Sequence, residues 1–317
     1  MTLLNTGPAP ARDLPTGPAA PRRRPASPSH RGDGPLAWLL IAPALIGFLV
    51  FAVYPTLRGV YLSFTEFRVL TPPKWIGIAN FQELAGDPVF WNSLRVTVYF
   101  VVVAVGLTVI AAVTTAAVLH RLTSSTVIRG LIILPFLISG VVAATVWSWM
   151  LDPQLGIVNA AVHAFGGDGV QFLTSREWAI PSIAFIHVWK NLGYTAIILF
   201  AGLQTIPPQV YEAGRIDGAG ETRMFFSLTL PLLRPILALV LVLNVIGAFQ
   251  VFDLVSVTTK GGPANASNVL QMYIYSKAFG QFDFGYASAM SLALFAILIA
   301  ITFLQMRLLR ANESEQA

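Results

Sequence analysis

Six apolar segments, each near the length that crosses a lipid bilayer, restrict the fold of this chain more than any other feature. A helix of about 20 residues spans the ~30 Å hydrocarbon core of a membrane. Inside hydrocarbon every backbone N–H and C=O group needs a partner within the segment, so such segments form helices. We therefore predict an all-α membrane protein with six transmembrane helices, at about residues 36–57, 95–119, 131–151, 179–203, 232–256 and 286–306.

The composition supports a membrane protein. The chain is 55% hydrophobic and 11% charged, whereas about 25% of the residues of a soluble domain are charged. The sequence contains no cysteine, which excludes disulfides, thiolate metal sites and cysteine nucleophiles. The net charge of +5 is small and suits basic membrane edges better than nucleic-acid binding.

The chain divides into two regions of different composition. Residues 1–34 are rich in Pro, Ala, Gly and Arg and show no apolar helical face, which predicts a disordered, basic cytoplasmic tail. Residues 35–317 hold the six spans and form the predicted transmembrane domain. With the N-terminus inside the cell, twelve Lys and Arg residues fall on the inner side and seven on the outer side, although the tail supplies five of the twelve. We predict cytoplasmic N- and C-termini.

Motifs for catalysis and for metal binding are missing from the sequence. It has no G-x-x-x-x-G-K-[ST] phosphate loop, no H-E-x-x-H and no G-x-S-x-G. Its four histidines, His30, His120, His163 and His187, show no metal-ligand spacing. We expect no catalytic residue, no metal and no cofactor, and therefore a chain that is not an enzyme.

A polar loop, residues 204–231, separates the fourth and fifth predicted spans. Its two prolines suit the first turn of a helix, which predicts a short amphipathic helix at 207–216 along the cytoplasmic surface. Gly218 permits a sharp turn. A second short helix is expected at about 221–229, and Pro231 is expected to end it and open the fifth span. We call residues 204–231 the elbow.

The elbow follows the pattern E-A-A, three residues, G, nine residues, I-x-L-P, with every spacing kept. The matching residues are Glu212, Ala213, Gly214, Gly218, Leu228, Leu230 and Pro231. Gly214 replaces the usual alanine and Leu228 the usual isoleucine, and both changes are small. The pattern resembles the signature of the membrane subunits of binding-protein-dependent ABC importers, and Asp217 before the glycine also matches its common form.

Further stretches are similar to a narrower group, the sugar permeases of the maltose, lactose and glycerol-phosphate type. These stretches are 42–64, 75–84, 134–159 and 252–267. The resemblance runs from about residue 36 to 310 and is closest to the subunit that pairs with a second, different permease. It implies a six-helix permease bundle with a cytoplasmic coupling helix, located in the cell (inner) membrane.

The resemblance also implies partners and coupling residues. The partners are a second permease subunit, two ATP-binding subunits that hydrolyse ATP, an extracytoplasmic substrate-binding protein and the lipid bilayer, without nucleic acid. The implied coupling residues are Glu212, Ala213, Gly214, Asp217, Gly218, Leu230 and Pro231. In that role Glu212 accepts charge-assisted hydrogen bonds from an ATP-binding subunit.

Polar side chains within spans are costly, and they usually face a cavity or one another. The candidates for the substrate pathway are Trp189, Lys190, Asn191, Tyr194, Asn244, Gln250 and Asp253. Aromatic rings stack on sugar C–H faces, and amides and carboxylates bind hydroxyls. By the resemblance, Gln250 corresponds to a substrate-contacting position. Lys190 either pairs with Asp253 as a structural bridge or serves transport.

Together these features predict a permease subunit of an ATP-driven importer for a sugar or related polyol. It forms half of the translocation pathway and couples through residues 205–231. The lysine ammonium also suits a phosphate-bearing substrate, so a glycerophosphodiester importer remains an alternative. An ion-coupled secondary carrier predicts inverted repeats, broken helices and a membrane carboxylate pair, none of which the sequence reveals. A non-transporting scaffold leaves the polar clusters unexplained.

Overall fold

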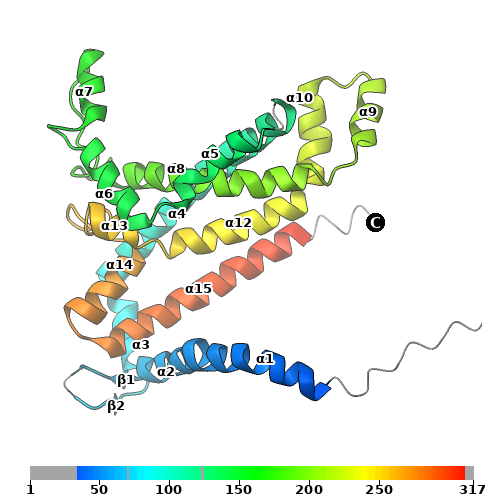
Figure 1. Ribbon diagram of the computed structural model, residues 1–317. Helices are drawn as coiled ribbons and strands as arrows, with labels where there is room; N and C mark the ends of the chain where they lie inside the picture. Colours follow the sequence, from blue (N-terminus) through cyan, green and yellow to red (C-terminus); the bar gives the residue numbers. More distant parts are fainter. Residues whose placement is uncertain (1–33, 70, 123–124, 311–317) are drawn as a thin grey trace, which may run out of the picture. The chain divides into compact units, whose positions relative to one another are not determined.

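The computed structural model describes residues 34–69, 71–122 and 125–310 (Figure 1). It divides into two units, Met1–Tyr54 and Pro55–Ala317. The predicted tail, residues 1–34, lies outside the described residues except for Gly34, where the first helix begins.

The described part of the first unit is helical. Helix α1, Gly34–Phe48, continues into the π-helical turn η1, Leu49–Val53. Its residues are almost all apolar, and its large apolar side chains from Trp38 to Phe48 are exposed, as expected for a helix surrounded by lipid. The helical stretch Trp38–Ser63, which ends in α2 (Tyr54–Ser63), is long and apolar enough to cross a membrane.

The second unit is a helical bundle with one small β-hairpin. The hairpin pairs β1, Thr65–Glu66, with β2, Lys74–Trp75, in antiparallel register. The helices of this unit after the hairpin are α3 (Ala79–Gly86), α4 (Pro88–Leu122), α5 (Thr126–Leu137), α6 (Gly140–Met150), α7 (Ile157–Ala164), α8 (Ala179–Leu203), α9 (Pro208–Ile216), α10 (Glu221–Met224), η2 (Phe225–Thr229), α11 (Leu230–Leu232), α12 (Arg234–Phe249), α13 (Asp253–Thr258), α14 (Leu270–Tyr275), η3 (Ser276–Gly280) and α15 (Phe284–Arg310).

Five long apolar helices overlap five of the predicted spans. Among the described residues, five helices are long and apolar enough to cross a membrane, and a sixth span is possible if one bent pair is counted together. The fourth span, Ala179–Leu203, has the predicted limits. The second begins seven residues earlier than expected, because α4 starts at Pro88. The fifth, Arg234–Thr258, is interrupted at residues 250–252 between α12 and α13.

The third span differs from the single helix that the sequence predicts. It consists of α5 and α6, which are bent by 90° relative to each other. Ile138 and Ser139 between them adopt extended backbone conformations, with ψ of 136° and 142°. Pro135, in the last turn of α5, has no N–H to donate to the helix ladder, which weakens the helix just before the break.

The bundle packs around α8 and α4. Helix α8 lies against α4 and α5, and α12 lies against α4 and α15. Small buried residues line these contacts, among them Ala104, Ala112, Ala116 and Ala196. Gly193 of α8 approaches the backbone of α5 so closely that an added Cβ would collide with the Ile132 carbonyl oxygen. Since lipid is as apolar as these side chains, close backbone approach is what stabilises such helix pairs.

A polar cluster joins the N-terminal end of α4 to α14 and α15. The Asp87 carboxylate accepts hydrogen bonds from the hydroxyls of Tyr273 (2.6 Å) and Tyr286 (2.7 Å) and from the backbone N–H of Val89 (2.8 Å) and Phe90 (3.3 Å). Burial by itself raises the pKa of Asp87, but these four hydrogen bonds outweigh burial and lower that pKa below its ordinary value. The ionised carboxylate therefore holds three helices together.

We expect Asp87→Asn to lower the free energy of unfolding at neutral pH by about 1–3 kcal/mol, the range for hydrogen bonds to a charged group. A carboxyl group whose pKa is lowered by folding stabilises the fold above its unfolded pKa, and this contribution is lost as the pH falls. The difference between the two proteins should therefore shrink below about pH 4. Thermal unfolding of the detergent-solubilised proteins across pH measures it.

Asp168→Asn is the control for this prediction. Asp168 is exposed and makes no hydrogen bond or ion pair with the described residues, so its substitution should leave stability unchanged at every pH. Equal unfolding temperatures for Asp87→Asn and the wild type at pH 7 would contradict the structural role of the carboxylate.

Candidate functional site

The elbow folds as two helical legs joined by a glycine turn. The first leg is α9, and the second is the continuous helical run from Glu221 to Leu232. Gly218 between them has a φ of +74°, which favours glycine. Pro231 was expected to end the second leg, but the leg runs one residue past it and the chain turns at Leu233.

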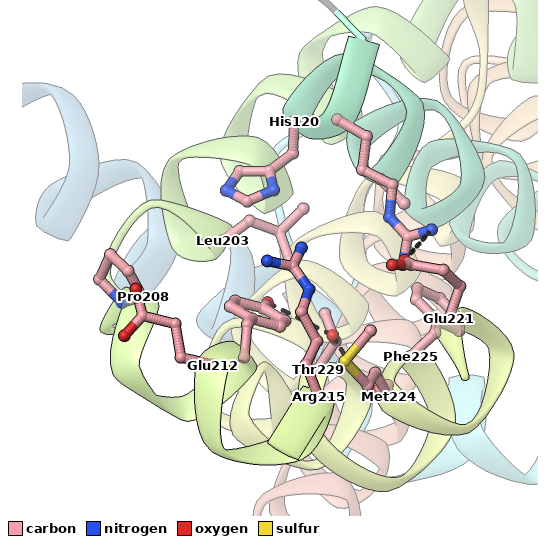
Figure 2. A pocket seen from close by; sticks show the side chains of 12 residues that line it. His120, Leu203, Pro208, Glu212, Arg215, Glu221, Met224, Phe225 and Thr229 are labelled. Atoms are coloured by element: carbon pink, nitrogen blue, oxygen red, sulfur yellow. Dashed lines mark hydrogen bonds and ion pairs between the residues drawn. The ribbon is translucent and has the colours of Figure 1, made fainter. Parts of the chain in front are cut away.

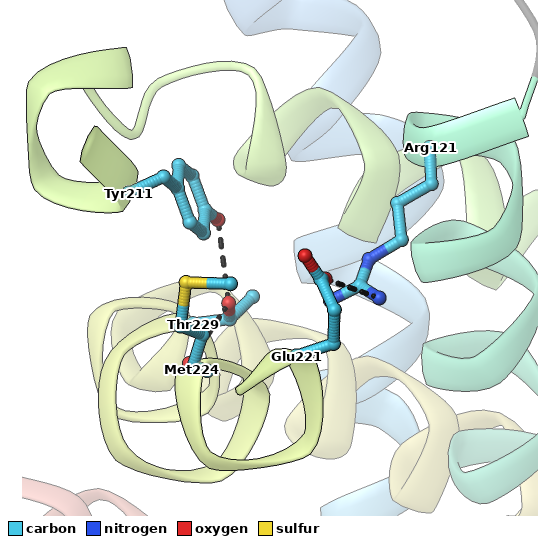
Figure 3. A network of polar contacts seen from close by, with 5 residues as sticks. All are labelled: Arg121, Tyr211, Glu221, Met224 and Thr229. Carbon is cyan, nitrogen blue, oxygen red and sulfur yellow. Dashed lines mark hydrogen bonds and ion pairs between the residues drawn. The ribbon is translucent and has the colours of Figure 1, made fainter. Parts of the chain in front are cut away.

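Contacts between the two legs close the elbow on itself. The hydroxyl groups of Tyr211 in α9 and Thr229 in η2 are hydrogen-bonded at 3.3 Å (Figure 3). Gly214 is buried against the second leg, where an added Cβ would lie 2.9 Å from Cδ1 of Leu228 and 3.6 Å from Met224. Glycine in place of the usual alanine therefore permits a close approach of the two legs.

A hollow separates the elbow from the C-terminal end of α4 (Figure 2). Its volume is about 520 Å³, and its walls come from α4, α8, α9, α10 and η2. An ion pair bridges one side of it, because Arg121 Nη1 of α4 lies 2.7 Å from Glu221 Oε2 of α10. His120, the neighbouring residue of α4, lines the hollow together with Glu212 and Arg215 of α9.

The structure divides the predicted coupling residues into exposed and packed ones. Glu212, Ala213, Asp217 and Gly218 are exposed, whereas Gly214 is buried and Leu230 and Pro231 are half-buried. Within the described part of the chain, Glu212 makes no hydrogen bond or ion pair. Ala213, Asp217 and Gly218 therefore form an exposed outer face, Glu212 is exposed and also lines the hollow, and the buried Gly214 brings the two legs together.

Ile216 belongs to the outer face but was missed by the sequence analysis. Its side chain is 87% exposed at the C-terminal end of α9. The sequence did contain a signal for it, because Ile216 is a large apolar residue between the charged residues Arg215 and Asp217 in a polar turn. Exposed apolar side chains within a polar rim are typical of protein–protein contacts.

Four of the seven predicted substrate-pathway residues line one polar cavity within the spans. The cavity has a volume of about 200 Å³ and lies where α8 faces the start of α6 and the interruption between α12 and α13. The four residues are Lys190, Asn191, Gln250 and Asp253. His187 and Gly140 also line it, and neither was a predicted pathway residue. The Asn191 amide donates to the His187 carbonyl oxygen at 2.9 Å.

The other three predicted pathway residues lie outside this cavity and pack elsewhere. Trp189 meets Trp147 edge to face, with ring centroids 5.5 Å apart. Tyr194 stacks on Phe136 at 4.4 Å, so one face of its ring is covered. Asn244 donates to the Val240 carbonyl oxygen at 2.9 Å within its own helix.

Lys190 and Asp253 lie on the two sides of the break in the third span, Lys190 beside the end of α5 and Asp253 beside the start of α6. The Lys190 ammonium donates to the Phe136 carbonyl oxygen (3.4 Å) in the last turn of α5, where helix carbonyls lack partners. The Asp253 carboxylate lies against Gly140, the first residue of α6, where an added Cβ would be 2.6 Å from Oδ2. The structure shows no ion pair between Lys190 and Asp253 among the described residues, so the predicted bridge between them is absent.

Metal binding has no visible basis in this part of the chain. Among the described residues, no three His, Cys, Asp or Glu side chains are grouped so that they could hold a metal ion.

Comparison with known proteins agrees with the elbow motif and with the helical bundle. Residues 104–314 match the family model of the binding-protein-dependent transport system inner membrane component. The sulfoquinovosyl glycerol transport system permease protein of Agrobacterium fabrum is 33% identical over 285 residues, which cover 89% of this chain and 92% of that protein. The chain belongs to this family.

Two further permeases resemble the chain at similar levels. The lactose transport system permease protein of Rhizobium radiobacter is 36% identical, covering 84% of this chain and 92% of the relative. The trehalose/maltose transport system permease protein of Thermococcus litoralis is 32% identical, covering 87% and 94%. The predicted resemblance to permease subunits of carbohydrate importers is thereby confirmed, as is the prediction of a transport subunit rather than an enzyme.

A solved structure matches the fold of the permease. A bacterial ABC transporter involved in the import of the acidic polysaccharide alginate superposes with a TM-score of 0.78 at 25% identity, covering 87% of this chain and 95% of the matched chain. The predicted permease fold is confirmed. The family membership also disfavours the ion-coupled carrier, although a broken helix of the kind expected for a carrier is present in the third span.

Proposed function

We propose that this permease forms half of the pathway of an ATP-driven importer for a sugar or related polyol. A second, different permease subunit supplies the other half, two ATP-binding subunits dock on the cytoplasmic side, and an extracytoplasmic binding protein delivers the substrate. The observation that carries the proposal is the elbow, a closed pair of helical legs with an exposed acidic and apolar outer face. The sugar-transporting relatives support the substrate class.

The outer face of the elbow is the docking surface for an ATP-binding subunit. Glu212 offers an exposed carboxylate to a basic group of the partner, and charge-assisted hydrogen bonds of this kind are about twice as strong as neutral ones. Ala213 and Gly218 allow close approach, and Ile216 offers apolar area. Since Gly214, Leu230 and Pro231 are packed, the elbow moves as one body when the ATP-binding subunits close.

This docking requires the elbow, and with it both chain termini, to face the cytoplasm. With six spans the chain returns to the side on which it starts, so the start of the first span and the end of the sixth lie on the same side as the elbow.

The polar cavity between α6, α8 and the α12–α13 interruption is the substrate pathway of this subunit. Gln250 and Asn191 supply amide groups for sugar hydroxyls. Lys190 and Asp253 lie in the same cavity, on the two sides of the break in the third span. One N–H of the Lys190 ammonium is bonded to the Phe136 carbonyl oxygen, which leaves two donors for a substrate.

We expect Gln250→Ala to raise the KM for uptake by about fivefold, because one neutral hydrogen bond contributes about 1 kcal/mol. The matched control is Asn244→Ala in α12, because its amide lies outside the cavity and donates to the Val240 carbonyl oxygen and to the Thr195 hydroxyl. The KM of the control should be unchanged, and the basal rate of ATP hydrolysis should be unchanged in both variants. Equal KM values for the two variants would place the pathway elsewhere.

Reconstitution tests the proposed function directly. Proteoliposomes that contain this permease with its second permease, ATP-binding subunits and binding protein are supplied with radiolabelled maltose, lactose or sulfoquinovosyl glycerol. Uptake of at least one sugar that requires ATP and all the partners is the expected result. Uptake by the permease alone would overturn the proposal, and so would complete complexes that hydrolyse ATP but import none of a broad sugar panel.

A further inference from the structure

We propose that the last turn of α4 clasps both legs of the elbow, and that this clasp delivers elbow movement directly to the second span. This inference rests on the proposed function, because it assigns a route to motion that the ATP-binding subunits start. His120 and Arg121 are the positioning residues of the clasp. The sequence analysis assigned neither residue a coupling role, because both lie more than 80 residues before the elbow in the chain.

The first contact of the clasp is the ion pair between Arg121 and Glu221. Its shortest distance is 2.7 Å, and the two side chains are 43% and 59% exposed (Figure 3). An exposed ion pair adds little to stability, because water screens it. Its geometry is nevertheless specific, since Arg121 is in the last turn of α4 and Glu221 in the first turn of α10, where each charge is favoured by the helix end.

The second contact is an aromatic one and reaches the other leg. The His120 ring lies 6.5 Å from the Tyr211 ring of α9 and 6.3 Å from the Phe200 ring of α8. Tyr211 is in turn hydrogen-bonded to Thr229 of the second leg. Two consecutive residues of α4 therefore contact the two legs separately, His120 the first leg and Arg121 the second.

The hollow of about 520 Å³ lies between the last turn of α4 and the elbow, and the two contacts of the clasp cross it. Val210 and Tyr211 of α9 also pack against the apolar cluster to which Leu119 of α4 belongs. By sequence the elbow is joined only to α8 and α12. The clasp adds α4, a 35-residue helix that packs along both α8 and α12, to the helices that the elbow moves.

The clasp predicts that α4 and the second leg stay together during the ATP cycle. The chain has no cysteine, so spin labels can be placed at Val118 of α4 and Thr222 of α10, on the two sides of the ion pair. The distance between the labels is measured by double electron–electron resonance in the complete complex with cysteine-free partners, without nucleotide and after trapping with ATP and vanadate. We expect one narrow distribution in both states.

Charge variants test whether the ion pair, rather than Arg121 or Glu221 alone, holds α4 and the second leg together. Arg121→Glu should broaden the distance distribution and lower sugar imported per ATP hydrolysed by about fivefold, at the low end of coupling between sites. The double variant Arg121→Glu/Glu221→Arg should restore both properties. The control Arg307→Glu makes the same charge change on an exposed residue of α15, far along the chain from the elbow, and should change neither.

A photo-cross-linker at Ile216, on the exposed end of α9, distinguishes failure of the clasp from failure of the proposed function. The clasp would be refuted if cross-links to an ATP-binding subunit form but the label-distance distribution stays narrow in Arg121→Glu. It would also be refuted if those cross-links form but the double variant does not restore the wild-type properties. In both cases the docking of the elbow would stand. A label distance that changes between the two nucleotide states of the wild type would also refute the clasp. Loss of every cross-link to an ATP-binding subunit, in wild type and variants alike, would instead refute the docking of the elbow.

Discussion

Insertion of two residues between Gly218 and Gly220 is expected to reduce sugar uptake by about tenfold or more while ATP hydrolysis by the complex continues. The inserted residues lengthen the turn between the two legs, so α9 shifts against the second leg. That shift breaks the hydrogen bond between Tyr211 and Thr229 and separates Gly214 from Leu228. A loosened elbow absorbs the motion of the ATP-binding subunits instead of transmitting it. Uptake and phosphate release by proteoliposomes measure the two rates.

Two point variants serve as comparisons for the insertion. Gly220→Ala keeps the length of the turn at a residue with open space around its Cα and an ordinary φ of −68°, so uptake should persist. Glu212→Ala removes the exposed carboxylate without changing the contacts between the legs, so it should uncouple hydrolysis from uptake by weakening docking alone. Normal uptake by the insertion variant would contradict the coupling role of the elbow.

The substitution Gly193→Ala is expected to destabilise the bundle by about 1–3 kcal/mol or more, the range for overpacking. The added Cβ would collide with the Ile132 carbonyl oxygen and lie 2.7 Å from the Ile132 carbonyl carbon and 3.0 Å from Ile133 Cα. These are backbone atoms, so no side-chain rotation relieves the collision, and α5 must move away from α8. The fraction of monodisperse protein after heating in detergent measures the loss.

Gly106→Ala is the matched control in another span. Gly106 lies in α4, and an added Cβ would meet no atom within 4 Å. Alanine also favours the helix over glycine by about 1 kcal/mol, so this variant should be as stable as the wild type or more stable. If both alanine variants melt at the wild-type temperature, the close contact between α5 and α8 does not limit stability.

The sequence predicted the spans because a bilayer imposes a length and an apolar composition that can be read locally. The fourth span was predicted to the residue, at 179–203. The two legs of the elbow were predicted from proline and glycine positions, to within a residue for α9 at 208–216. The elbow motif carried the family resemblance, because its residues are consecutive or regularly spaced.

The bend in the third span and the end of the second elbow leg were not predicted correctly. Pro135 and Pro231 each lie within two residues of a helix end, Leu137 and Leu232, yet only Pro135 is followed by a 90° bend. At the bend after Pro135, the Lys190 ammonium donates a hydrogen bond to the Phe136 carbonyl oxygen, although the two residues are 54 positions apart in the chain.

The sequence by itself therefore determined the class of protein, the positions of the spans and the identity of the elbow, because each depends on residues that are neighbours in the chain. Only the tertiary structure decided which polar residues share a cavity, and it separated Lys190 and Gln250 from Trp189 and Tyr194. It also brought Arg121 to Glu221. Contacts between distant segments depend on how whole helices pack, and no local pattern of residues records that packing.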